Sequence, residues 1–252
     1  MTESADLFDL TGRVALVTGA GRGIGASIAD ALERQGATVF RHVRARGKGE
    51  ISRDGNYLAA DLADPAQVAS LASGFPADRL DVLVNNAGVE YSEDTTEISA
   101  ATFTETMLVN AWAPAHLIGA FTPLLAAGAG GSVINVTSLH AAFPYPGHLS
   151  YAASKSALEL VTRTTAVELG GLGIRVNSLC PGIIETDINR AVLDRLGRDS
   201  FASVVPLARV GSPEDLIGPA IFLASDASRY VSGATLVVDG GYAVNLARYG
   251  AD

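Results

Sequence analysis

Short apolar runs alternate with longer amphipathic segments along the whole chain. Runs of β-branched and apolar residues are typical of strands buried on both faces, whereas apolar residues at every third or fourth position indicate helices. The predicted strands cover residues 13–18, 38–43, 56–60, 80–85, 131–137, 174–179 and 234–238. This alternation predicts an α/β fold: a single-domain Rossmann-type doubly wound parallel sheet of about seven strands, with helices on both faces.

The helices predicted between these strands cover residues 26–35, 64–73, 98–126, 151–169 and 212–224. Gly36 and Gly170 follow two of them, at a position where glycine often ends a helix. Ser212 and Pro213 suit the N-cap and first turn of the last helix. The segment of about residues 185–210 is polar and irregular in pattern, and we expect it to be a mobile lid over the site.

Composition narrows the class of protein. The chain has 252 residues, 48% of them hydrophobic, which is enough for one domain with a full core. A net charge of −9 argues against a nucleic-acid surface, because such surfaces are basic. The single cysteine, Cys180, lies in an apolar stretch, so we expect a buried thiol. The acidic start of the chain shows no signal peptide, and we expect a cytoplasmic protein.

One helical segment is apolar enough to resemble a membrane span. Residues 111–129 contain Pro114, His116 and Pro123, and they continue a helical pattern that begins near Ala100. A helix buried against the sheet or against a partner subunit explains this pattern better than a span. We therefore expect no contact with a membrane.

A glycine-rich turn follows the first predicted strand directly and contains Gly19, Gly23 and Gly25. Strand, glycine turn and helix in this order can place a phosphate on the helix N-terminus, because glycine allows a tight turn and a close approach of the ligand. The spacing Gly-x3-Gly-x-Gly differs from the usual Gly-x-Gly-x2-Gly fingerprint. A turn without a ligand is the alternative.

Basic residues follow the second strand, where the adenosine ribose of a dinucleotide is expected to lie. Arg41, Arg44, Arg46 and Lys48 belong to this cluster, and Arg22 lies in the glycine turn. A carboxylate there would accept a hydrogen bond from a 2′-hydroxyl, whereas basic side chains suit a 2′-phosphate. We therefore expect NADP(H) to be preferred over NAD(H), with a merely solvated basic loop as the alternative.

Tyr151 and Lys155 lie four residues apart on a predicted helix, so that their side chains are neighbours. A phenol with a pKa near ~10 exchanges protons poorly at neutral pH, and a nearby ammonium favours the phenolate. A tuned tyrosine can exchange a proton with an alcohol or a carbonyl. Lys48 and Lys155 are the only lysines, although Tyr-x3-Lys also describes an ordinary surface pair. Ser138 ends the fifth strand, where open α/β sheets bind ligands.

Other residues at the strand ends add to this picture. Asp61 ends the third strand, and Asn86 and Gly88 close the fourth, although an Asn-Asn-x-Gly sequence also suits a plain tight turn. Asn110 lies in the middle of a helix, where asparagine is unfavourable and normally has a reason.

Taken together, these features resemble the short-chain dehydrogenase/reductase family over nearly the whole chain, residues 10–242. The motifs that carry the resemblance are Thr18-Gly-Ala-Gly-Arg-Gly-Ile-Gly25, Asp61, Asn85-Asn-Ala-Gly88, Asn110, Ser138, Tyr151-x3-Lys155, Pro181-Gly182 and Asp239-Gly-Gly241. Each motif is weak by itself, but their order and spacing are specific. Residues 206–225 are similar to gluconate and sugar-alcohol dehydrogenases and also to 3-oxoacyl carrier-protein reductases.

The resemblance implies four catalytic residues. Tyr151 would donate or accept the proton, and Lys155 would lower its pKa and bond the nicotinamide ribose. Ser138 would hold the substrate oxygen, and Asn110 would kink its helix and hold a water linked to Lys155. The cofactor-binding residues that the resemblance implies, besides Tyr151 and Lys155, are Gly19, Arg22, Gly23, Ile24, Gly25, Arg44, Asp61, Leu62, Asn86, Ala87, Gly88, Pro181, Gly182, Ile183 and Thr186.

The candidate substrate residues lie near the strand ends. They are Glu90, Ser138, His140, His148, Glu185 and Asn189, with Phe143 and Ile188 beside them. His140 could bond a second hydroxyl or carbonyl of a substrate, or merely shape the wall. We expect no metal site.

The expected function is NAD(P)-dependent hydride transfer between a secondary alcohol and a ketone, with Tyr151 as general acid or base. Glu90 and His140 favour a small polar substrate: a sugar, polyol or sugar acid. The alternatives are an apolar ketone or 3-oxoacyl thioester reductase, and a non-catalytic dinucleotide-sensing protein of the same fold. The resemblance also implies a homotetramer built through the long helices.

Overall fold

The computed structural model describes residues 6–44, 53–128, 130–187 and 189–245. Within these ranges the strands form one sheet in the order β3-β4-β2-β1-β5-β6-β7-β8. The strands are β1 (Val14–Val17), β2 (Thr38–Arg44), β3 (Arg53–Asp54), β4 (Tyr57–Ala60), β5 (Val82–Asn85), β6 (Ser132–Val136), β7 (Arg175–Pro181) and β8 (Thr235–Val238). All neighbours pair in parallel except β3, which pairs antiparallel with β4. The prediction of a parallel doubly wound sheet is confirmed, and the short β3 was not predicted.

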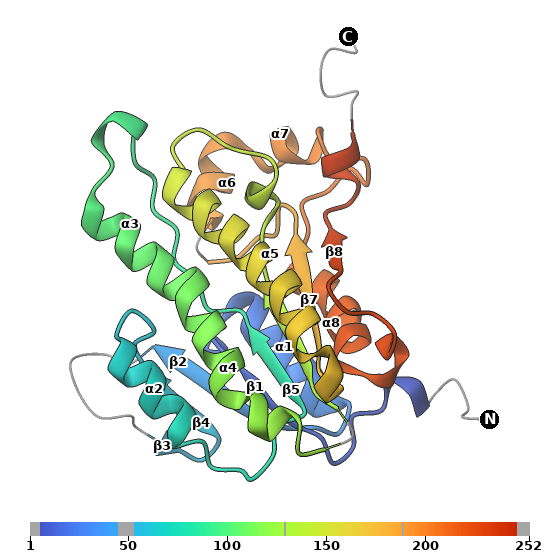
Figure 1. Ribbon diagram of the computed structural model, residues 1–252. Coiled ribbons are helices and arrows are strands. Elements are labelled where there is room, and N and C mark those ends of the chain that lie inside the picture. Colours follow the sequence, from blue (N-terminus) through green and yellow to red (C-terminus); the bar gives the residue numbers. More distant parts are fainter. Residues whose placement is uncertain (1–5, 45–52, 129, 188, 246–252) are drawn as a thin grey trace.

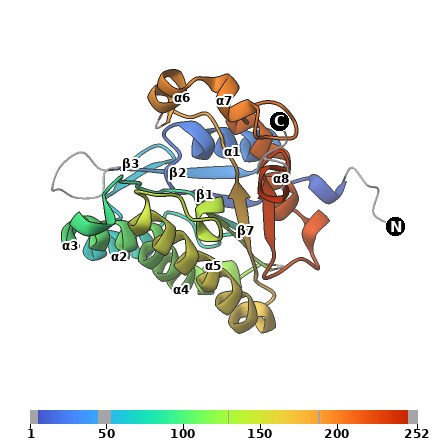
Figure 2. The same ribbon diagram turned by 90° about the horizontal axis from the view of Figure 1, so that it is seen from above.

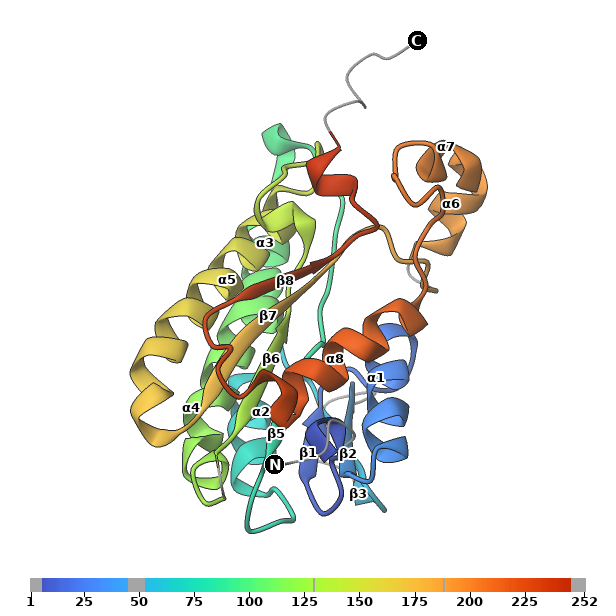
Figure 3. The ribbon, with the colours of Figure 1, turned by 90° about the vertical axis from the view of Figure 1, so that its right-hand side faces the viewer.

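The helices cover both faces of this sheet. They are α1 (Gly23–Arg34), α2 (Pro65–Ser73), α3 (Ala100–Met107), α4 (Ala113–Leu125), α5 (Leu149–Leu169), α6 (Arg190–Leu196), α7 (Arg198–Ala202) and α8 (Ile217–Ala224). As Figure 3 shows, α1 and α8 lie on one face, and α2, α4 and α5 lie on the other. Strand order reverses between β1 and β5, which places a ligand crevice at their carboxyl ends.

Two hydrophobic clusters hold these layers together. One packs Ile28 of α1 and Leu223 of α8 against one face of the sheet. The other packs Leu71 of α2 with Leu117 and Phe121 of α4 against the opposite face. The apolar runs of the strands therefore serve both clusters at once, as expected for a parallel sheet buried on both faces.

Helix α5 meets the sheet through a row of buried polar side chains. Asn85 of β5 donates to Asn135 of β6 (Nδ2 to Oδ1, 2.8 Å), and Asn135 donates to Thr162 of α5 (Nδ2 to Oγ1, 2.9 Å). Ser178 of β7 donates to the same Thr162 oxygen at 3.0 Å. The Thr162 hydroxyl donates a hydrogen bond to the carbonyl oxygen of Leu158 at 2.9 Å. Because buried polar groups need partners, this row fixes where α5 lies along the sheet.

The single long helix predicted for residues 98–126 is interrupted. A π-helical turn, Leu108–Trp112, joins α3 to α4 and contains Asn110. By length and composition Ala100–Leu125 could cross a membrane, but half of its most apolar window is buried. Those buried side chains, such as Phe121 and Leu125, belong to the cluster on the α2 and α4 face. This burial is what a core helix shows.

The segment predicted as an irregular lid contains regular structure. Residues 190–196 and 198–202 form α6 and α7, with Gly197 between them at φ +85°. Both helices lie on the same side of the sheet as α1, beyond the carboxyl end of β7 (Figures 2 and 3). The polar pattern of this segment arises because these short helices are covered on few sides, and not because the chain lacks helical structure.

Candidate active site

Ser138, Tyr151 and Lys155 meet at the carboxyl end of the sheet. Ser138 follows β6, and Tyr151 and Lys155 lie one turn apart near the start of α5, at the upper end of that helix in Figure 1. The Lys155 Nζ atom lies 5.7 Å from the centre of the Tyr151 ring. The structure therefore brings together three of the four residues that were predicted to be catalytic.

Lys155 is buried, and its ammonium group has a fixed partner. Nζ donates to the carbonyl oxygen of Val136, the last residue of β6, at 2.8 Å. Burial lowers the pKa of Lys155 to about 8. Desolvation of the charged form is the main cause of this shift. A lysine with this pKa can hold a positive charge or release a proton close to neutral pH.

We expected a lowered pKa for Tyr151, but in the chain by itself that pKa is raised, and Lys155 is not among the main causes of the shift. Burial raises the pKa of the Tyr151 phenol, and the negative charge of Glu90 raises it further. The Ser138 hydroxyl acts in the opposite direction. The sequence places Lys155 one turn from Tyr151, but it does not show how strongly the surroundings desolvate the phenol.

Asn110 is buried and uses its whole side chain within the protein. Its Oδ1 accepts from the Val89 N–H at 2.8 Å, and its Nδ2 donates to the Val89 carbonyl at 2.8 Å and to the Ser154 hydroxyl at 3.0 Å. The π-turn lets the side chain leave the helix toward these partners. Asn110 thus ties the segment after β5 to α5, and Ser154 is a partner that the sequence reasoning did not find.

The glycine turn after β1 is held by side chains from two neighbouring strands. Asn86 Nδ2 donates to the carbonyl oxygens of Thr18 (2.9 Å) and Gly19 (3.3 Å). Gly19 has φ +65°, and a Cβ there would lie 2.8 Å from Ala87 Cα. A side chain at this position would therefore be strained by the backbone conformation and by the space.

His42 also holds this turn, and sequence reasoning gave it no role. Its Nδ1 accepts from the Gly19 N–H at 3.2 Å, and its Nε2 contacts the Ala60 carbonyl oxygen at 3.1 Å. Burial lowers the pKa of His42 to about 4, so that the ring is neutral at pH 7. A polar residue inside an apolar strand was the signal that could have identified it.

The N-terminus of α1 fits a phosphate group. Within the described chain no side chain caps this helix at Arg22, and its first turn contains no acidic residue. The first amide groups of a helix lack partners inside it, and the helix dipole favours an anion there. Gly19, Arg22, Gly23, Ile24 and Gly25 could thus hold the pyrophosphate of a dinucleotide. With the dinucleotide bound, its nicotinamide would give or accept the hydride.

The basic cluster is smaller than predicted. Arg41 is buried, and its guanidinium contacts Asp30 and Glu33 of α1 at 2.7 Å each, so it cannot read a phosphate. Arg44 is mostly exposed and lies 3.7 Å from Asp61 and 3.5 Å from a carboxylate oxygen of Glu105. Arg22 is exposed. Arg46 and Lys48 lie outside the described residues.

Most of the remaining predicted cofactor residues follow the carboxyl ends of β4, β5 and β7. Leu62 follows β4 and is buried in the cluster on the α2 and α4 face. A Cβ on Gly88 would lie 3.3 Å from Asn110 Oδ1, so the Gly88 backbone packs closely against the Asn110 side chain. Gly182 donates to the carbonyl of Val238, and Ile183 lines a small cavity beside it. A Cβ on Gly23 would lie 3.7 Å from Thr186, which brings Thr186 next to the glycine turn.

Two predicted substrate residues have structural partners instead. Glu185 forms ion pairs with Arg190 of α6 (3.4 Å) and Arg198 of α7 (2.7 Å). Asn189 accepts from the Thr186 N–H and donates to the Ile184 carbonyl, both at 2.8 Å. These residues hold the start of the α6 and α7 segment. Ile188 lies outside the described residues.

Glu90, His140 and His148 do come together beside Tyr151. The Nδ1 atom of His148 lies 2.8 Å from Glu90 Oε1. The His140 ring packs edge-on against the Tyr151 ring at 5.7 Å and stacks on Tyr145 at 5.9 Å. Burial lowers the pKa of His140, which keeps its ring neutral at pH 7. Phe143 is exposed on the same loop.

Cys180 is buried, as predicted. Burial raises the pKa of its thiol to about 11, so that the sulfur stays protonated and unreactive at neutral pH.

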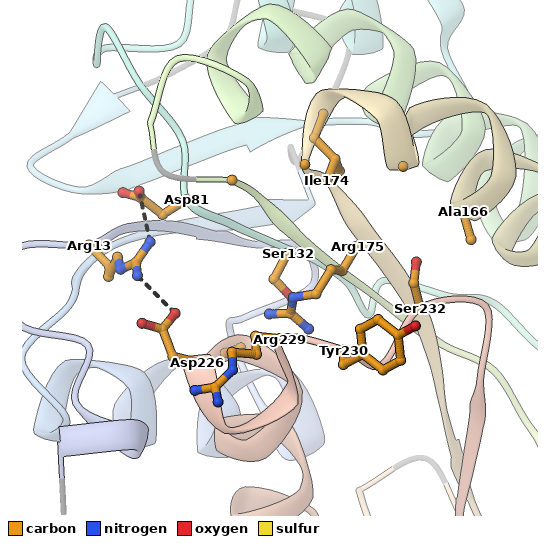
Figure 4. A pocket seen from close by; sticks show the side chains of 14 residues that line it. Arg13, Asp81, Ser132, Ala166, Ile174, Arg175, Asp226, Arg229, Tyr230 and Ser232 are labelled. Atoms are coloured by element: carbon orange, nitrogen blue, oxygen red, sulfur yellow. Dashed lines mark hydrogen bonds and ion pairs between the residues drawn. The ribbon is translucent and has the colours of Figure 1, made fainter. Parts of the chain in front are cut away.

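A separate cavity of about 360 Å³ lies at the other end of the sheet (Figure 4). Arg13 bridges Asp226 (3.1 Å) and Asp81 (3.6 Å) on its wall. Arg175 donates to Ser228 and to the carbonyls of Leu223 and Ser225. These charges are satisfied within the protein, and the cavity opens at the amino ends of the strands, away from Tyr151.

Comparisons with known proteins agree with this geometry. A family model described as Enoyl-(Acyl carrier protein) reductase matches residues 19–243. The D-threitol dehydrogenase of Mycolicibacterium smegmatis is 34% identical, over 97% of this chain and 100% of that protein. An L-rhamnose 1-dehydrogenase (NAD(P)(+)) of Azotobacter vinelandii is 37% identical, over 94% of this chain and 99% of that one.

Solved structures show the same fold. The crystal structure of a gluconate 5-dehydrogenase from Burkholderia cenocepacia, in complex with NADP and tartrate, matches with a TM-score of 0.86 at 31% identity. The match covers 96% of this chain and 99% of that one. With the glycine turn, the uncapped α1 terminus and the Ser138, Tyr151 and Lys155 group at one end of the sheet, the chain belongs to the short-chain dehydrogenase/reductase family of NAD(P)-dependent oxidoreductases.

Proposed function

We propose that this oxidoreductase acts on a secondary hydroxyl of a polyol, sugar or sugar acid. The observation that carries the proposal is the polar group of Glu90, His140 and His148 beside Tyr151. A substrate with several hydroxyls could bond these side chains while one of its hydroxyls reaches Ser138 and Tyr151. An apolar ketone would leave them desolvated and unpaired, at a cost of about 1–3 kcal/mol for each group. The names of the D-threitol and L-rhamnose relatives support the same class.

The proton step is assigned to Tyr151. Oxidation of an alcohol removes the hydroxyl proton and transfers a hydride to the nicotinamide. Tyr151 Oη would accept the proton while Ser138 Oγ holds the same substrate oxygen. Because Lys155 is protonated below about pH 8, it would favour the phenolate form of Tyr151 electrostatically.

The test is a substrate panel with two variants. The purified protein is assayed with NAD⁺ and NADP⁺ against polyols, aldoses and aldonic acids, and in reverse with simple ketones and a 3-oxoacyl thioester. Activity confined to the polyhydroxylated compounds supports the proposal. Tyr151→Phe should lower kcat by at least about 10²-fold and leave dinucleotide binding unchanged. A preference for the thioester, or wild-type turnover by Tyr151→Phe, would contradict it.

For the cofactor, we propose a preference for NADP(H) over NAD(H). The support is the exposed Arg22 at the start of α1 and the largely exposed Arg44 at the end of β2. Both can approach a 2′-phosphate, and Arg44 would then exchange its contacts with Asp61 and Glu105 for it. Titration with NADPH and NADH tests this. Arg44→Gln should weaken NADPH binding and leave NADH binding unchanged, and equal loss for both would refute the assignment.

We also propose a homotetramer. On α5, Leu160 and Val167 expose 59% and 83% of their surface, and apolar side chains on one helix face favour a partner. The family resemblance points to the same helix. Light scattering during size-exclusion chromatography tests this directly, and a monomer at micromolar concentration would overturn it. Leu160→Arg should shift the elution toward smaller species.

A further inference from the structure

Three side chains capable of binding a metal converge beside Tyr151 from three separate segments. Glu90 lies in the segment after β5, His140 in the short turn Leu139–Ala141 after β6, and His148 at the N-cap of α5. One donor atom of each lies within 4.8 Å of the donor atoms of the other two. All three were predicted as substrate residues and not as metal ligands, because their positions along the chain follow no ligand spacing.

Each of the two histidines has a ring nitrogen without a hydrogen-bond partner in the part of the chain that the structure describes. Within the described residues, the Nδ1 atoms of His140 and His148 are buried and have no hydrogen-bond partner. His148 Nδ1 lies 2.8 Å from Glu90 Oε1, but not in the geometry of a hydrogen bond. By contrast, both ring nitrogens of His42 have partners. A buried polar atom without a partner is unfavourable, so a ligand that binds both ring nitrogens would be stabilised here.

The chemistry of the set suits a divalent transition metal. Two imidazoles and one carboxylate are a common ligand set for Zn²⁺ and similar first-row ions. A tetrahedral ion about 2.1 Å from each ligand separates the ligand atoms by about 3.4 Å. The distances here, from 2.8 Å to at most 4.8 Å, bracket this value. Small side-chain rotations would therefore complete the site.

The aromatic rings around the set keep the required side-chain rotations small. His140 stacks on Tyr145 and packs edge-on against both His148 (5.6 Å) and Tyr151 (5.7 Å). Aromatic contacts of this kind hold a ring in place before any ligand binds. The set is thus partly preorganised, which lowers the entropy lost on binding.

We propose that Glu90, His140 and His148 bind one divalent transition-metal ion, of the Zn²⁺ class, beside Tyr151. Three protein ligands leave at least one coordination position open. If the substrate is polyhydroxylated, as the proposed function has it, an open coordination position would hold the substrate hydroxyl that neighbours the reacting hydroxyl. The ion itself requires neither the dinucleotide nor the substrate.

The test is a zinc titration of the whole chain, freed of metal by a chelator, with no dinucleotide or substrate added. A chromophoric chelator competes for Zn²⁺, and its absorbance gives stoichiometry and affinity. We expect one Zn²⁺ per chain in the micromolar range or tighter. His140→Ala and His148→Ala should each weaken binding about tenfold or more. Glu90→Gln, on an exposed residue, serves as a third variant if a histidine variant fails to fold.

His116→Ala is the matched control. His116 stacks on Trp112 at 5.0 Å in α4 and does not belong to the set. It should bind Zn²⁺ as the wild type does. Binding that survives unchanged in all three site variants, binding lost equally in His116→Ala, or no saturable binding below about 100 µM would each overturn the proposal. Dehydrogenase activity is not used as a readout, so a wrong substrate class would leave this result intact.

Discussion

The backbone N–H of Gly19 donates to the Nδ1 atom of His42, 3.2 Å away. The same imidazole contacts the carbonyl of Ala60 through Nε2, at 3.1 Å. One buried ring on β2 therefore joins the glycine turn after β1 to the end of β4. The bond needs a neutral ring, because a protonated Nδ1 cannot accept a hydrogen bond.

His42 should make stability depend on pH. Its pKa is lowered from 6.5 to about 4, so the unfolded chain binds the proton first as pH falls. Stability is therefore full above pH 6.5 and declines between 6.5 and 4, by about 2 kcal/mol between pH 8 and pH 5 from this residue. Urea unfolding at the two pH values should show that His42→Asn loses less stability on acidification than the wild type. An equal loss in both proteins would contradict the role.

Asn110→Ala should be strongly destabilising. The change leaves the N–H and carbonyl of Val89 and the hydroxyl of Ser154 without their partner. We expect a loss of about 3 kcal/mol in the free energy of unfolding, since each unpaired buried group costs about 1–3 kcal/mol and some relaxation follows. Ser154→Ala removes only one of these bonds to Asn110 and should cost about 1 kcal/mol. Similar losses of stability in the two variants would show that the bonds from Asn110 to Val89 contribute little.

Gly25→Ala should impair dinucleotide binding. A Cβ at Gly25 would lie 2.3 Å from Asn86 Nδ2 and 2.5 Å from the Gly19 carbonyl oxygen, so the turn would have to shift. We expect the dissociation constant for the dinucleotide to rise by about tenfold or more, measured by fluorescence titration.

The control for this change is Gly119→Ala in α4, where a Cβ would meet nothing within 4 Å. It should bind the dinucleotide normally and could gain up to about 1 kcal/mol in stability, because alanine favours a helix. Tight binding by Gly25→Ala would show that the turn is more adaptable than its contacts indicate.

Lys155 should make dinucleotide binding sensitive to alkaline pH. Burial lowers its pKa from 10.5 to about 8, so the positive charge is present below pH 8 and is lost above it. If the ammonium bonds the nicotinamide ribose, the dissociation constant should rise up to about tenfold between pH 7 and pH 9. Lys155→Met should bind weakly at both values and show no such change. A wild-type affinity that does not vary over this range would exclude the contact.

The architecture follows from local pattern because each strand and helix repeats one periodicity over many residues. The parallel strands and the helix carrying Tyr151 and Lys155 were visible in this way, whereas the pattern predicted one unbroken helix through Asn110 and only the family resemblance implied a kink there. Residues at the carboxyl ends of parallel strands must meet, so the grouping of Ser138 with Tyr151 followed from the fold.

Side-chain partners did not follow, because they depend on how the folded chain brings each side chain to its neighbours and not on hydrophobic periodicity. Arg41 was assigned to the phosphate but pairs with Asp30 and Glu33 of α1. Asn189 was assigned to the substrate but holds the backbone of its own loop. The pKa of Tyr151 depends on how fully the folded chain removes water from the phenol, which no local pattern records.

The polar row between α5 and the sheet has a consequence for how the protein can change. Apolar contacts would let a helix slide by a turn, whereas the bonds from Asn135 and Ser178 to Thr162 permit one alignment. The reacting groups thus keep their position independently of the 185–210 segment, which is anchored through Glu185 and Asn189. The 185–210 segment can therefore be remodelled without displacing Tyr151 and Lys155 from the end of the sheet.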